Sequence, residues 1–147
     1  MLTYQSSTIA LSAIVYLLST SVSLSEGAVA LGLAGDVSRY GYSIGIVVGR
    51  DREADARREA LDWCRTRSAG TKETRSNCEI VITFRDQCVA EANDPEPGTP
   101  GFGWAVGPTR QAAERSAMVN CEATAGSSRQ RFCKRAGRVL CDGAADR

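Results

Sequence analysis

Two segments of the chain resemble each other, and this internal likeness limits the architecture more than any other feature. Residues 41–64 read GYSIGIVVGRDREADARREALDWC, and residues 101–121 read GFGWAVGPTRQAAERSAMVNC. Each segment opens on a glycine and an aromatic residue, runs through small apolar residues to a glycine, and ends in an alanine-rich stretch that closes on a cysteine. We therefore expect two similarly built halves, at about residues 27–87 and 88–143.

The alanine-rich stretches have the spacing of one face of an α-helix. Small side chains recur every four residues: Ala56, Ala60 and Cys64 in the first half, and Ala113, Ala117 and Cys121 in the second. Residues at this spacing lie on the same side of a helix, and small side chains there allow close approach to a sheet. Each half is thus predicted to contain one helix that packs closely on strands.

Apolar and alternating runs on both sides of each predicted helix indicate β-strands. The runs cover residues 28–33, 42–49, 78–84, 88–92, 102–107, 131–135 and 139–141. The proline-rich segment 93–101 reads as a surface loop, because halves of roughly 60 residues are too small to bury separate cores. The predicted fold class is α+β: a single small disulfide-rich domain with a pseudo-two-fold repeat of strand-strand-helix-strand, two helices packed on an antiparallel sheet.

The first 25 residues differ from the rest of the chain. They contain no Lys, Arg, Asp or Glu, and a mostly apolar run from Ile9 to Leu18 precedes several serines. This pattern predicts a signal peptide over residues 1–25, cleaved near residues 23–26, and a single secreted domain over residues 26–147. An uncleaved anchor is the alternative, but the apolar run is short against the roughly 20 residues of a spanning helix. We expect a secreted or periplasmic protein with no spanning helix in the mature chain.

All six cysteines lie in the predicted mature chain, where an oxidising compartment favours disulfides. The chain has no His and no CxxC spacing, which argues against a zinc site, and we expect no cofactor. Six cysteines allow fifteen connectivities. If the halves fold alike, the simplest pairs are Cys64–Cys78, Cys121–Cys133 and Cys88–Cys141. We expect the last pair to hold one half against the other.

Basic residues gather near the C-terminal end, although the formal net charge is only +1. Residues 129–138 contain no acidic side chain and the following basic ones: Arg129, Arg131, Lys134, Arg135 and Arg138. Together with Arg110, which is predicted to lie at the start of the second helix, they are the expected contacts to an anionic group or another partner. A solvated strand face is the alternative explanation.

The composition argues against most catalytic mechanisms. Without His, a Ser-His-Asp or Cys-His site is excluded. No phosphate-binding glycine motif matches either. Carboxylates of the first predicted helix alternate with arginines, as on a solvated helix face, and a carboxylate-dependent hydrolase is therefore the less favoured alternative; the residues concerned are Asp51, Asp55, Glu59 and Asp62. We expect no enzymatic activity and no catalytic residue.

Aromatic side chains lie at equivalent positions near the strand starts of the two halves: Tyr40, Tyr42, Phe102 and Trp104. Packing in the core is the favoured explanation. The alternative is a stacking surface for a sugar or a peptide beside the proline-rich loop.

Two stretches are the most distinctive of the chain, GWAVGPTRQAAERSA at residues 103–117 and ITFRDQC at residues 82–88. With them, roughly residues 27–143 resemble the bacterial secreted family catalogued as domain of unknown function 4189. The resemblance implies export, a small α/β fold and disulfides, and some members look like secreted proteins acting at a host interface. It supplies no catalytic residue. Cys121 and Cys133 distinguish this chain from members with fewer cysteines.

The sequence therefore predicts a secreted or periplasmic, disulfide-stabilised binding module without enzymatic activity. Its expected partner is an anionic envelope component, a host component or a protein, and not a specific nucleic acid. An inhibitor or toxin-neutralising protein is the alternative.

Overall fold

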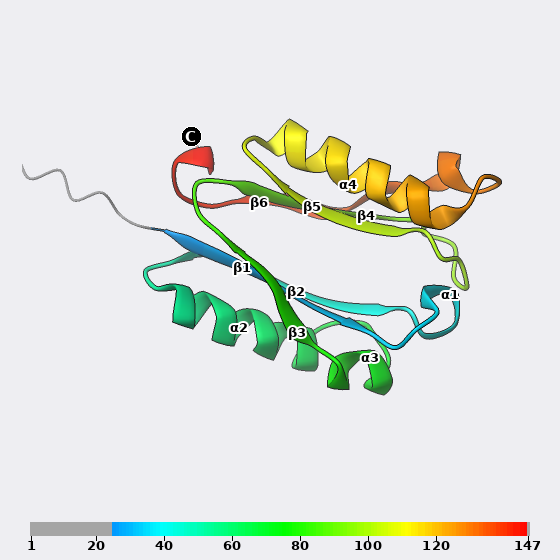
Figure 1. The fold of residues 1–147 in the computed structure, drawn as a ribbon, viewed down its shortest axis with the longest axis horizontal. Coiled ribbons are helices and arrows are strands. Elements are labelled where there is room, and N and C mark those ends of the chain that lie inside the picture. Colours follow the sequence, from blue (N-terminus) through cyan, green and yellow to red (C-terminus); the bar gives the residue numbers. More distant parts are fainter. Residues whose placement is uncertain (1–24, 147) are drawn as a thin grey trace, which may run out of the picture.

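A computed structural model describes residues 25–146, which form four layers in the order helix, sheet, sheet, helix (Figure 1). The first sheet consists of β1 (Glu26–Leu33), β2 (Tyr42–Arg50) and β3 (Glu79–Phe84), and the second of β4 (Cys88–Asn93), β5 (Phe102–Gly107) and β6 (Lys134–Cys141). Both are antiparallel, and each has its first strand in the centre, in the orders β2-β1-β3 and β5-β4-β6.

Helices cover the two outer faces of this pair of sheets. The long helices are α2 (Glu53–Thr66), on the first sheet, and α4 (Arg110–Ala125), on the second (Figure 1). Short helical segments complete the described chain: α1 (Val37–Tyr40), α3 (Lys72–Ser76), η1 (Gln130–Phe132) and η2 (Gly143–Asp146). The mixture of helices and antiparallel strands agrees with the predicted composition of the fold.

The expected arrangement of two helices on one sheet is wrong, because the strands form two separate three-stranded sheets. Each sheet carries apolar side chains on both faces, so one face packs against a helix and the other against the opposite sheet. The inter-sheet core contains Val29, Phe84 and Val89, with these partly buried neighbours: Ile44, Ile46, Val48, Ile82, Trp104, Val106 and Leu140. The halves are therefore joined through their sheets.

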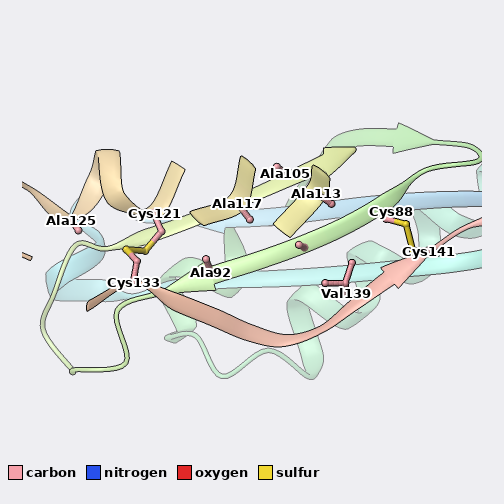
Figure 2. Close-up of a cluster of buried hydrophobic side chains, with 11 residues drawn as sticks. Cys88, Ala92, Ala105, Ala113, Ala117, Cys121, Ala125, Cys133, Val139 and Cys141 are labelled. Atoms are coloured by element: carbon pink, nitrogen blue, oxygen red, sulfur yellow. A yellow bond between two sulfur atoms is a disulfide. The ribbon is translucent and has the colours of Figure 1, made fainter. Parts of the chain in front are cut away.

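Each long helix approaches its sheet at a strand glycine. A Cβ atom placed on Gly45 of β2 would lie 2.1 Å from the carbonyl oxygen of Ala60. On Gly103 of β5 it would lie 2.3 Å from the nitrogen of Cys121 and 2.5 Å from the carbonyl oxygen of Ala117. The predicted small-residue faces of both helices are buried at these contacts, and Figure 2 shows the face of α4 against the second sheet.

The structure contains the three disulfides that the sequence predicts, Cys64–Cys78, Cys121–Cys133 and Cys88–Cys141. The first two link a helix to the chain that follows it. The expected role of Cys88–Cys141 is wrong, because these cysteines face each other on β4 and β6 of one sheet (Figure 2). Cys88 begins the central strand and Cys141 ends its antiparallel neighbour, so the bond lies within the second half.

A buried carboxylate links the two halves instead. Asp142 follows β6 and is only 1% exposed. Its Oδ1 accepts hydrogen bonds from the hydroxyl of Ser25, at 2.5 Å, and from the backbone nitrogen of Gly49, at 2.7 Å. Oδ2 accepts no hydrogen bond from any residue between 25 and 146. The C-terminal end of the second sheet is thus tied to the start of β1 and the end of β2.

We expect Asp142→Ala to lower the free energy of unfolding by about 2–4 kcal/mol, because Ser25 and Gly49 lose a charged acceptor in a buried place. Asp142→Asn, which keeps one carbonyl oxygen, should lose less. Urea denaturation monitored by circular dichroism measures both variants. An alanine variant as stable as the parent would show that this link contributes nothing.

The predicted signal peptide and its cleavage site lie almost entirely outside the described residues. Between residues 25 and 146, no helix is both long enough and apolar enough to span a membrane.

Candidate functional site

The predicted partner-contact residues fall into two groups in space. Arg110, Arg135 and Arg138 line one cavity of about 480 Å³ beside the edge strand β6. Arg129 and Arg131 lie with Phe132 around η1, and Lys134 is exposed at the start of β6. The N-terminus of α4 and the strand β6 thus contribute to the first group, while the segment from the end of α4 to the start of β6 carries the second.

The cavity beside β6, which we call the basic cavity, is held by contacts around α4 and β6. Arg110, the first residue of α4 after its capping residue Thr109, donates a hydrogen bond to the carbonyl oxygen of Val139, at 2.9 Å. Arg135 lies 3.7 Å from Glu114, with both side chains substantially exposed. An exposed ion pair of this kind contributes little binding energy and is easily exchanged. Three arginines and one glutamate are the charged residues of the lining.

Arg129 has a different environment from the other predicted contacts. Its guanidinium donates to Asp94 and to Glu96, both at 2.6 Å, and lies over the ring of Phe132. The carboxylate of Asp94 is almost fully buried, and its hydrogen bond to Arg129 lowers the pKa of that carboxyl. Arg129 therefore fixes the proline-rich loop to the turn after α4.

A larger cavity, of about 600 Å³, is lined by residues of α1 and of the proline-rich loop. These two segments lie at one end of the molecule (Figure 1). We call this cavity the end cavity. Tyr40 and Tyr42 line it, and the ring of Tyr42 stacks on Phe102 with centroids 3.7 Å apart. Trp104 packs instead in the core between the sheets. The predicted aromatic group is therefore divided between a cavity and the core.

A chain of hydrogen bonds connects polar groups of the end cavity. The amide nitrogen of Asn93 lies 3.3 Å from the hydroxyl oxygen of Tyr42, and that hydroxyl donates to Glu91 Oε1 at 2.5 Å. Burial raises the pKa of Glu91, and burial together with the adjacent carboxylate raises the pKa of Tyr42. Glu91 was not predicted as a site residue, although it is the only charged side chain in the strand run CVAEA, residues 88–92.

Two of the four carboxylates that the sequence analysis considered, Asp55 and Glu59, form surface ion pairs. Asp55 pairs with Arg52 and Arg58, and Glu59 pairs with Arg50. These hydrogen bonds lower the pKa of both carboxyl groups. In residues 25–146, no group of three or more potential ligands is arranged to hold a metal ion.

Comparison with known proteins identifies the family of this chain. No curated protein and no solved structure matches the chain. The sequence model of the family described as "Domain of unknown function (DUF4189)" matches residues 27–139, from the second residue of β1 to the third-last residue of β6, and thus covers both long helices. The chain therefore belongs to the DUF4189 family.

Proposed function

We propose that this protein is an exported, disulfide-stabilised binding module that recognises anionic groups of an envelope or host partner, without catalysing a reaction. The observation that supports this proposal most is the basic cavity, which Arg110, Arg135 and Arg138 line together. Three disulfides in a chain of this size are typical of proteins from oxidising compartments. The proposal includes cleavage of an N-terminal signal peptide on export. It also includes a pseudo-two-fold relation between the two halves of the domain.

The chemistry of arginine supports an anionic ligand. Guanidinium groups bind carboxylate and phosphate through paired hydrogen bonds, and several of them around a concave surface raise the local concentration of anions. Arg138 is exposed, and the one ion pair of Arg135 within residues 25–146 is its long contact with Glu114. Both side chains belong to β6, where Arg135 lies opposite Ala92 of β4 and Arg138 lies in the irregular stretch between Ala136 and Leu140.

Charge reversal tests the basic cavity. We expect Arg135→Glu/Arg138→Glu to weaken binding to phosphatidylglycerol vesicles about tenfold or more, because both substitutions replace attraction by repulsion. Co-sedimentation at low and high NaCl measures the effect, and the parent should bind less tightly at high salt. Phosphatidylcholine vesicles are the uncharged reference.

Arg57→Glu/Arg58→Glu is the matched control, since it changes the net charge equally on the exposed face of α2. This control should retain most of the binding. If both double variants lost the same affinity for the vesicles, the net charge of the protein, and not the basic cavity, would explain the binding. Binding that does not weaken at high salt would also contradict recognition of anions by the basic cavity.

An inhibitor or toxin-neutralising protein is the second candidate. The supporting observation is that β6 forms one edge of its sheet, and an edge strand offers unpaired backbone groups to another chain. This function requires a stoichiometric complex with one protein that persists at high salt. Size-exclusion chromatography of native extracts distinguishes it from salt-sensitive anion binding.

A further inference from the structure

The end cavity contains a carboxylate without a cationic partner. Glu91 forms no ion pair within residues 25–146, where its one hydrogen-bond donor is the neutral hydroxyl of Tyr42. A carboxylate removed from water is costly unless a positive group or several donors compensate it. Glu91 is only partly buried, and it lines a cavity. A cationic ligand in that cavity can therefore reach the carboxylate.

The neighbouring acids already share a cationic partner. Asp94 and Glu96 also line the end cavity, but both are bound by Arg129. Arg39 lies at the rim, exposed, with its guanidinium 5.1 Å from the centroid of the Tyr40 ring. Glu91 is therefore the carboxylate of this cavity that lacks a guanidinium partner among the described residues.

The aromatic lining suits the same kind of ligand. Tyr40 and Tyr42 line the cavity, and aromatic faces attract ammonium and guanidinium groups, as Arg39 over the Tyr40 ring shows. The volume of about 600 Å³ lies within the range of small-ligand sites, roughly 300–1,000 Å³. Pro95 and Pro97 stiffen the opposite wall, which the Arg129 ion pairs attach to the body of the protein.

We propose that the end cavity is a binding site for an organic cation, an ammonium or guanidinium group on a short aliphatic chain, with Glu91 as its counter-ion. The Tyr42 hydroxyl accepts from Asn93 and donates to this carboxylate, which restrains its position at the cavity wall. The site is independent of the basic cavity and takes ligands of opposite charge. A lysine or arginine side chain of an extended peptide has this chemistry.

Binding of small probes to the full mature protein tests the site. The probes are Nα-acetyl-lysine methylamide, Nα-acetyl-arginine methylamide and the Nε-acetylated lysine compound, which has the same stem without the charge. We expect one or both cationic probes to shift the amide resonances of residues 40–42 and 91–101, and the neutral compound to bind at least about tenfold more weakly. The relative affinity of the two cationic probes distinguishes ammonium from guanidinium recognition.

Glu91→Gln removes the charge and keeps an oxygen that accepts from Tyr42. We expect this variant to lose about tenfold or more of its affinity for the cationic probes, and to melt at the same temperature as the parent or higher. Glu96→Gln is the matched control, because Glu96 lines the same cavity but is paired with Arg129; its affinity should change less than about threefold.

Three results would overturn the proposal: no shift with either cationic probe at millimolar concentration, equal affinity for the acetylated compound, or unchanged affinity in Glu91→Gln. None of them affects anion binding at the basic cavity, so failure here is separable from failure of the proposed function.

Discussion

Gly103→Ala is expected to lower the free energy of unfolding by about 3–5 kcal/mol, a large effect for the addition of one methyl group. The new Cβ would lie 2.3 Å from the nitrogen of Cys121 and 2.5 Å from the carbonyl oxygen of Ala117. Both are backbone atoms of α4, so the whole helix must move away from β5. The helix would then lose its close contact with the sheet along the face that Figure 2 shows.

Equilibrium denaturation measures this effect, with Ser116→Ala as the control. Ser116 lies on the exposed side of α4, and its substitution should change stability by less than about 0.5 kcal/mol. Gly45→Ala should resemble Gly103→Ala, because its Cβ would meet Ala60 of α2 in the same way. A Gly103→Ala protein as stable as the control would contradict the close helix-sheet contact.

Removal of the Cys88–Cys141 disulfide is expected to cost about 4 kcal/mol, and removal of Cys121–Cys133 about 3 kcal/mol, by chain-entropy arguments. The difference follows from the sequence separations of 53 and 12 residues, since the longer loop restricts the unfolded chain more. Double alanine variants refolded under oxidising conditions allow both values to be measured in urea. The reverse order of the two losses would show that native packing around the sulfurs, and not loop closure, decides the effect.

The helices and their buried faces could be predicted because the information is local. A four-residue spacing of Ala and Cys places these side chains on one side of any helix, whatever lies opposite. The disulfide pairs could also be predicted, because the likeness of the two halves limits the number of plausible cysteine pairings. The glycines at 45 and 103 belong to the same local pattern, but only the structure shows that a helix backbone touches them.

The assembly of the strands could not be predicted in the same way. A strand with apolar residues on both faces has the same sequence pattern whether its second face packs against a helix or against another sheet. The sequence therefore does not indicate that the strands form two sheets. For the same reason the sequence did not show that Cys88 and Cys141 lie on neighbouring strands. The link that Asp142 forms between the halves could not be predicted either, because nothing in the sequence distinguishes this residue from other acidic residues.

The candidate sites depend on contacts between residues distant in sequence. Arg129 was grouped with its basic neighbours, but its partners Asp94 and Glu96 come from the loop before β5. Arg110 and Arg138 are 28 positions apart in the numbering yet line one cavity. Glu91 could not be predicted as a site residue, because its hydrogen-bond donor Tyr42 belongs to the other half of the chain.

The state of the cysteines in protein from its own compartment is the most direct test of an exported module clamped by disulfides. Intact mass and peptide mapping without reduction should show a chain that begins near residues 23–26 and contains the pairs Cys64–Cys78, Cys88–Cys141 and Cys121–Cys133. Free thiols on these cysteines, or a peptide joining Cys64 to Cys121, would contradict it.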